Sequence, residues 1–189
     1  MSQPYLEYFL SIESDLERCG RFVEFTSDNF KTYSVEFARI IMAAASEFDA
    51  LAKNLCKLID PLRKPDRINQ YFPIITSKFP KFTECAVQMQ RYKLDFKPWD
   101  GWTSESGPEW WSKGYNKIKH NRDAHFPQAN LGNSILATAG LFVGILYFHR
   151  CKFCRVPVIE SFQAPRLFQL GNYDPSNTPT GGRLYNIPL

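Results

Sequence analysis

The chain has 189 residues, of which 44% are hydrophobic and 22% are charged, and its formal net charge is +4 at pH 7. These values exclude extensive disorder and the strong positive charge of a histone-like protein, and the length is sufficient to bury one core. The five cysteines are odd in number and scattered, which argues against a secreted disulfide framework and favours a reducing cytoplasm.

Two long amphipathic helices are predicted in the first third of the chain. In the first, apolar residues recur at steps of three and four and form one stripe: Tyr5, Phe9, Ile12, Leu16 and Cys19. The second keeps the same step from Phe37 to Leu58, with Ser34 as its N-cap and a stop at Asp60, which precedes a proline. The two continuous stripes predict that these helices pack close to antiparallel.

The region from 60 to 108 contains six prolines and is predicted to connect helices. We expect a short helix at about 67–78 and a two-stranded hairpin within an insertion at about 80–107. The hairpin is indicated by alternation in AVQMQRYKLDF, where Val87 and Met89, then Leu94 and Phe96, face one way. A hairpin of this size is unstable alone, so it must lie against the helices.

Two further helices are predicted on either side of Pro127. The stretch SESGPEWW starts the first, with Pro108 in its first turn, and this helix runs to about Phe126. The second runs from about 129 to 149 and is apolar nearly all round, which is typical of a helix in the centre of a bundle or one shared with a second subunit. Gly140 and Gly144 permit close approach of another backbone in either arrangement.

Residues 1–156 are therefore interpreted as one all-α domain, an antiparallel helical bundle with a small β-hairpin insertion. An extended C-terminal tail follows at 157–189. Its first half has apolar residues that could pin it to the bundle, and its last dozen residues are expected to be mobile. The pinning residues are Phe162, Leu167, Phe168, Leu170 and Tyr173.

No membrane association is expected. The N-terminus lacks the basic and apolar regions of a signal peptide, and the longest apolar run, 135–148, is shorter than the roughly 18–20 residues of a membrane span. CKFC at 151–154 is a single Cys-x-x-Cys, which offers fewer ligands than the four of a usual zinc site. We therefore expect a cytoplasmic protein that binds no metal.

The segment WWSKGYNKIKHNRDAHF, residues 110–126, concentrates basic and polar side chains. At about 100° per residue, one face of a helix here bears Trp111, Tyr115, Ile118, Arg122 and His125. Lys119 and Asn121 flank this face, and His120 points away from it. A stripe that begins as aromatic core is thus predicted to end in an arginine and a histidine.

Two interpretations of this segment stay open. Cations in the last turn of a helix interact with its dipole by about 0.3–1 kcal/mol each, which would leave a merely solvated surface. Alternatively, Arg and Lys bind a phosphodiester while a histidine that titrates near neutrality moves a proton. Those two functions suffice for RNA cleavage without a metal or cofactor, in which the ribose 2′-hydroxyl attacks the adjacent phosphorus.

A helical bundle with a charged motif that ends in histidine, just before the last long helix, resembles the HEPN superfamily. The stretches GPEWWSKGYNKIKHNRDAHF and ANLGNSILATAGLFVGILYF also resemble a group of bacterial proteins with a similar WW…YN…KH-x-R core. The resemblance covers roughly residues 86–150. It implies a small helical dimer that in many members is a metal-independent endoribonuclease of a toxin–antitoxin or phage-defence system, while other members keep the fold without activity.

The family signature is an Arg, a polar residue and then a His, with four to six residues between the Arg and the His. Counted back from His125, this spacing falls on Lys119 or His120 rather than on Arg122. The resemblance thus implies His125 as the general acid or base, with Lys119 and Arg122 stabilising the phosphorane. The predicted substrate-binding residues are Lys113, Asn116, Lys117, His120 and Asn121.

Two functions follow as alternatives. The first is a homodimeric endoribonuclease whose two motifs meet across the final helices, at about 129–149. The second is a catalytically inactive HEPN-like module that binds RNA, an antitoxin-like partner protein or a neighbouring subunit, with the tail contributing to the contact.

Overall fold

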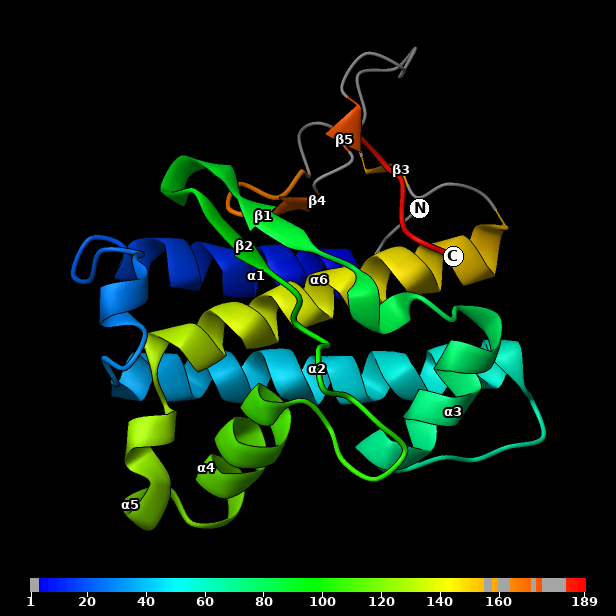
Figure 1. Ribbon diagram of the computed structural model, residues 1–189, viewed down its shortest axis with the longest axis horizontal. Coiled ribbons are helices and arrows are strands. Elements are labelled where there is room, and N and C mark those ends of the chain that lie inside the picture. The colour runs from blue at the N-terminus through cyan, green and yellow to red at the C-terminus, as the bar shows by residue number, and fades with distance from the viewer. Residues whose placement is uncertain (1–3, 155–157, 160–163, 171–172, 175–182) are drawn as a thin grey trace.

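The computed structural model describes residues 4–154, 158–159, 164–170, 173–174 and 183–189 (Figure 1). This part of the chain is mainly helical, as predicted, with small antiparallel sheets at one side of the bundle. The long helices are α1 (Pro4–Cys19), α2 (Val35–Ile59) and α6 (Leu131–Phe153). The short helices are α3 (Ile68–Lys78), α4 (Asn116–His120) and α5 (Arg122–His125).

Helices α1 and α2 form where the apolar stripes predict them. The Ser34 hydroxyl accepts a hydrogen bond from the backbone N–H of Phe37 at 3.1 Å, which confirms it as the N-cap of α2. The helix ends at Ile59, and Asp60 leaves the helical conformation before proline, as expected. Tyr5, near the start of α1, accepts a hydrogen bond from Asn54, near the end of α2, so the two helices run antiparallel.

Helix α6 runs in the opposite direction to α1 but in the same direction as α2, which corrects the prediction of a uniformly antiparallel bundle. The rings of Phe9 and Phe142 stack at 5.3 Å, and those of Tyr5 and Phe148 meet at the same distance, so α1 and α6 are antiparallel. Tyr33 forms a β-bridge with Asn130, so α2 and α6 start side by side. The chain between them returns along the bundle through α3, the hairpin and α4 (Figure 1).

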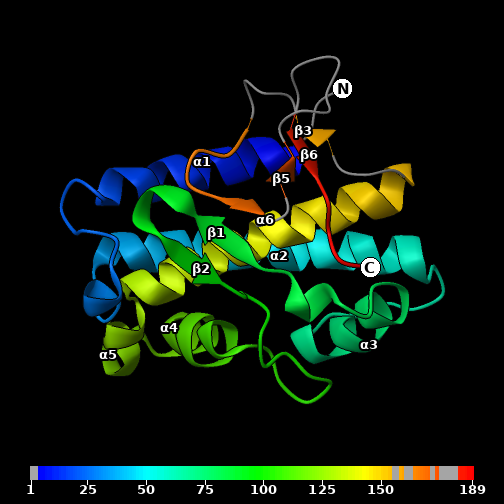
Figure 2. The ribbon, with the colours of Figure 1, turned by 45° about the horizontal axis from the view of Figure 1, so that its top comes forward.

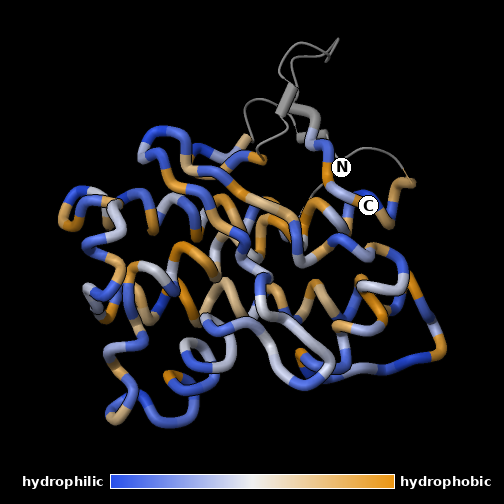
Figure 3. Tube along the Cα trace, in the orientation of Figure 1, coloured by the Kyte–Doolittle hydropathy of each residue, from blue (hydrophilic) through white to orange (hydrophobic). Residues whose placement is uncertain are grey.

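Helix α6 is the centre of the bundle, and most of its residues are buried by the chain's own elements. Figure 3 shows the hydropathy of each residue along the trace. A Cβ atom on Gly144 would lie 2.9 Å from the Phe48 ring, and one on Gly140 would lie 3.0 Å from the Trp110 ring. The glycines therefore admit aromatic side chains rather than a second backbone. This burial favours a helix in the centre of the bundle over a helix shared with a second subunit. A homodimer formed through α6 stays a prediction.

By length and composition α6 could cross a membrane, which corrects the expectation of an apolar run too short to do so. However, 78% of its most apolar window is buried inside the protein. A helix that is hydrophobic all round is also typical of the core of a folded domain.

The predicted hairpin is confirmed, and it is part of a larger sheet. Strands β1 (Val87–Met89) and β2 (Leu94–Phe96) pair antiparallel and lie over α6 (Figure 2). A 3₁₀ turn and Lys93, in the left-handed conformation at φ 54°, connect them. The tail adds β4 (Gln169–Leu170) to the other edge of β1. A second small sheet has the order β3 (Val158–Ile159), β6 (Arg183–Tyr185), β5 (Tyr173–Asp174).

The tail packs on the bundle along much of its described length. Leu167, Phe168 and Leu170 are buried, as predicted, whereas Phe162 and the side chain of Tyr173 lie outside what the structure describes. The end of the tail, expected to be mobile, contacts the bundle at Tyr185 and Pro188. Tyr185 is buried, and the Tyr147 hydroxyl donates a hydrogen bond to the carbonyl of Pro188 at 2.6 Å.

A buried carboxylate on α1 attaches the tail. Glu13 accepts hydrogen bonds from the backbone N–H groups of Arg166 and Leu167, both at 2.9 Å, and of Phe168 at 3.3 Å. Burial raises the pKa of Glu13, while the three backbone hydrogen bonds act in the opposite direction. The carboxylate thus supplies acceptors for three N–H groups of a segment that has no helix or long strand of its own.

We expect Glu13→Ala to lower the free energy of unfolding by about 3 kcal/mol, because it leaves buried backbone donors without an acceptor. Glu17→Ala is the matched control, since its surface ion pair with Arg166 at 3.4 Å is worth less than about 1 kcal/mol. Urea unfolding of both variants measures the difference. Equal losses would contradict the anchoring role of Glu13.

Candidate functional site

The polar segment at 110–126 is anchored by its two tryptophans. Trp110 is 1% exposed and Trp111 is 4% exposed, and both belong to a π-helical turn, Trp110–Tyr115. A π-helix has more residues per turn than an α-helix, so consecutive side chains differ less in direction and both rings reach the core. The indole N–H of Trp110 also donates to the carbonyl of Pro98 at 2.5 Å.

The single helix predicted up to Phe126 is wrong, because the chain breaks at Asn121. Its backbone leaves the helical region at φ −154°, and its side-chain oxygen accepts the N–H of Ala124 at 3.3 Å. Asparagine is a favoured N-cap, and here it caps a new short helix, α5. The buried stripe therefore ends at Ile118, and Arg122 is exposed rather than on the core-facing side.

The break creates a groove between the α4–α5 connection and the first half of α2, which we call the basic groove. It has a volume of about 540 Å³ and includes three cationic side chains and one acid. Its lining residues are Val35, Ala38, Arg39, Met42, Ile118, Lys119, His120, Asn121, Arg122 and Asp123. Apolar side chains thus supply part of its wall, and cations from three helices, α2, α4 and α5, face the same space.

The predicted site residues divide between this groove and other places. Lys119, His120, Asn121 and Arg122 all line the groove. His125, the histidine chosen from the spacing, is half-buried at the end of α5 and is not among the lining residues of the basic groove. The structure thus brings His120, not His125, together with the two cations.

Two predicted binding lysines lie away from the groove. Lys113 forms an exposed ion pair with Glu109 at 2.8 Å, four residues earlier. Lys117 is exposed on α4 and does not line the basic groove. These lysines fit the solvated surface that was the alternative interpretation of the segment.

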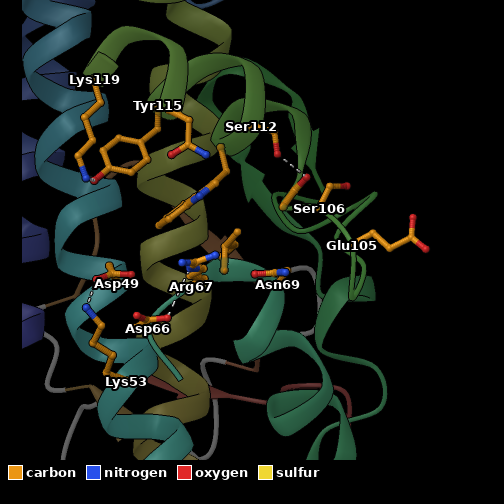
Figure 4. A pocket seen from close by; sticks show the side chains of 14 residues that line it. Asp49, Lys53, Asp66, Arg67, Asn69, Glu105, Ser106, Ser112, Tyr115 and Lys119 are labelled. Atoms are coloured by element: carbon orange, nitrogen blue, oxygen red, sulfur yellow. Dashed lines mark hydrogen bonds and ion pairs between the residues drawn. The ribbon is translucent and has the colours of Figure 1, made fainter. Parts of the chain in front are cut away.

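A second hollow adjoins the basic groove, and we call it the mixed-charge cleft (Figure 4). Its volume is about 570 Å³. It is lined by Asp49, Lys53, Asp66, Arg67, Ile68, Asn69, Glu105, Ser106, Gly107, Trp111, Ser112, Tyr115, Asn116 and Lys119. Asn116, a predicted binding residue, therefore belongs to this cleft, and Lys119 lines both hollows.

Lys119 is held in position by Tyr115, one turn earlier. Its ammonium donates to the Tyr115 hydroxyl at 3.3 Å and lies 5.3 Å from the centre of the ring (Figure 4). An ammonium has three N–H donors, so this hydrogen bond leaves two for a ligand. The lysine chosen from the family spacing is thus a directed cation between two hollows.

Sequence reasoning missed Arg39, which faces the basic groove from α2. The Nη1 atom of Arg39 contacts both carboxylate oxygens of Glu36, at 2.6 and 2.7 Å. This pair looks like an ordinary helical ion pair in the sequence. Only the position of α2 beside residues 119–122 reveals that Arg39 also lines the basic groove.

The described residues give no metal-binding cluster, since no group of three or more His, Cys, Asp or Glu side chains gathers among them. In CKFC, Cys151 is half-buried and Cys154 is exposed at the end of α6. Burial raises the pKa of Cys151, which makes its thiolate less available.

No protein-family model, curated protein or solved structure matches this chain. The resemblance to the HEPN superfamily therefore stays a prediction.

We expect Lys119→Ala and Arg122→Ala to change the free energy of unfolding by less than about 0.5 kcal/mol each, because both side chains are exposed. Ile118→Ala, which removes a buried neighbour in α4, should cost about 2–4 kcal/mol. Thermal and urea unfolding measure these changes. A large loss in either cation variant would assign that residue a structural role.

Proposed function

We propose that this protein binds RNA through the basic groove. The observation that supports the proposal is the presence of Arg39, Lys119 and Arg122 in one groove with a single acid, Asp123. Arg and Lys side chains bind phosphate oxygens through charge-assisted hydrogen bonds. The groove also includes His120 and Asn121, which can donate hydrogen bonds to phosphate or ribose.

The start of α2, which lies beside the groove, adds to the positive potential. The backbone N–H of Ser34 donates to the carbonyl of Ala129 at 3.0 Å, and that of Leu131 donates to Thr32 at 2.9 Å, so α2 and α6 begin together. The N-terminal end of a helix has a partial positive charge, which favours a nearby anion. The groove lies against the first turns of α2, where Val35, Ala38 and Arg39 contribute to its wall.

The resemblance to the HEPN superfamily supports RNA as the ligand, as opposed to another anion. We propose that the chain is a HEPN-like module of the RNA-binding kind. Its exposed connection between α4 and α5 supplies groups that suit a phosphodiester, and the bundle supplies the rigid frame.

Binding is tested with a labelled single-stranded oligoribonucleotide and fluorescence anisotropy. We expect Lys119→Ala and Arg122→Ala each to weaken binding by about 3–10-fold and to reduce the slope of log K against log salt by about 0.7. Lys113→Ala removes the same charge outside the groove, so its affinity should stay within about twofold of wild type. If all three substitutions weaken RNA binding equally, the protein binds RNA through its net charge and not through the groove.

Metal-independent RNA cleavage is a second candidate function, favoured by the presence of His120 beside Lys119 and Arg122. A histidine there would take the proton of the ribose 2′-hydroxyl as its oxygen attacks phosphorus. The bond from phosphorus to the 5′-oxygen breaks, and that oxygen gains a proton, leaving a cyclic phosphate and a 5′-hydroxyl. The two cations would stabilise the added negative charge of the phosphorane.

Cleavage is tested by incubating the protein with RNA in EDTA. For this function we expect His120→Ala to abolish cleavage and His125→Ala to retain it, since only His120 lines the groove. If only His125→Ala abolishes cleavage, His125 is the general acid or base, as the HEPN signature implies. If the RNA stays intact with wild type and with both variants, RNA binding without cleavage is the function.

A further inference from the structure

We infer that the mixed-charge cleft holds the base and ribose of one unpaired nucleotide, so that the ligand is single-stranded RNA with a nucleotide turned out of the groove. This inference rests on the proposed RNA binding. It assigns different parts of the same ligand to the two neighbouring hollows.

The two hollows are contiguous at Lys119. Its side chain lines both of them, and its ammonium is directed by the Tyr115 hydroxyl at 3.3 Å. A phosphate bound at Lys119 would have one neighbouring nucleotide over the cleft and the next phosphate over the groove. The lysine is therefore the natural point at which an RNA strand would pass from one hollow to the other.

The charges of the hollows suit different parts of a nucleotide. The basic groove is lined by three cations and one acid. Arg39 is also paired with Glu36, so Lys119 and Arg122 are the cations that suit phosphates. In the cleft, Lys53, Arg67 and Lys119 are balanced by Asp49, Asp66 and Glu105. Because this balance opposes a run of phosphates, the cleft suits the uncharged base and ribose.

Part of this charge is already satisfied within the protein. Asp49 accepts hydrogen bonds from Lys53 at 2.5 Å and from the Tyr71 hydroxyl at 2.7 Å. Arg67 lies 3.7 Å from Asp66 in a looser, exposed pair. The cleft is thus a polar site with little net charge, and its free hydrogen-bonding groups determine what it can hold.

The cleft has the size and the polar groups for one nucleoside. Its volume of about 570 Å³ falls within the range of about 300–1,000 Å³ typical of small-ligand sites. Asn69 at the start of α3, Ser106 in the loop before Trp110, and Ser112 and Asn116 in the anchored segment all line it. Figure 4 shows Asn69, Ser106 and Ser112 on one side and Lys119 with Tyr115 on another. These side chains can pair with the edge of a base or with ribose hydroxyls.

Recognition in the cleft would use hydrogen bonds more than stacking. Trp111 is 4% exposed and Tyr115 is 6% exposed, so neither presents an open ring face to a base. A base must be unpaired for its edge to enter such a cleft, because duplex RNA hides those edges. The ligand class is therefore single-stranded RNA, distinguished from duplex RNA by access to the base.

The test compares three labelled RNAs of equal length: a single strand, the same strand with abasic positions, and a duplex. We expect wild type to bind the single strand about tenfold more tightly than the abasic strand, since the abasic strand lacks the base edges that would form hydrogen bonds in the cleft. Asn69→Ala combined with Asn116→Ala should remove most of this preference. Arg122→Ala should weaken binding of both strands by the same factor.

Each outcome decides between the two proposals. Equal affinity for the normal and abasic strands, or equal affinity for the duplex, overturns the nucleotide cleft and leaves the phosphate groove in place. Binding of none of the RNAs overturns the proposed function. Should the double variant unfold, as judged by circular dichroism, Ser106→Ala tests the same preference at an exposed residue of the cleft.

Discussion

Aromatic rings packed against the glycines of α6 hold together the three parts of the molecule that form the site. Phe48 of α2 lies against Gly144 and meets the Trp99 ring at 4.1 Å between centroids. Trp99 donates its indole N–H to the carbonyl of Gly140 at 3.1 Å, and Trp110 covers the same glycine. Larger residues at these two positions would separate α2 from α6 and displace the tryptophans. The position of the segment that bears Lys119 depends on this packing.

The site combines this rigid anchor with an exposed polar end. The π-helical turn places Trp110 and Trp111 in the core, and α4 then leads away from it with Ile118 as its last buried residue. Beyond that point Asn121 starts a new turn, and the side chains around it are free of the core. A ligand would therefore meet exposed side chains on a connection that is anchored at both ends, by buried Ile118 before it and by buried Ala129 after it.

The tail covers a different part of the same central helix. Because α6 is apolar on every side, two neighbouring helices cannot bury it completely. Phe168 contacts Phe9, and Tyr185 contacts Phe142, on the side of α6 that faces α1. Glu13 holds the tail there through backbone N–H groups, a contact that depends little on the side chains of residues 166–168.

The sequence by itself determined the features that depend on neighbours along the chain. The stripes of α1 and α2, the cap at Ser34, the hairpin, and the buried Trp111, Tyr115 and Ile118 all follow from local spacing and propensity. Tertiary structure decided the rest: the parallel course of α6 beside α2, the presence of Arg39 and Lys119 in one groove, and the cleft that Tyr115 lines. At Asn121 a side-chain cap competes with continuation of the helix, and the local pattern did not choose between them. Contacts between distant segments, which no periodicity encodes, placed His120 in the groove and left His125 outside it.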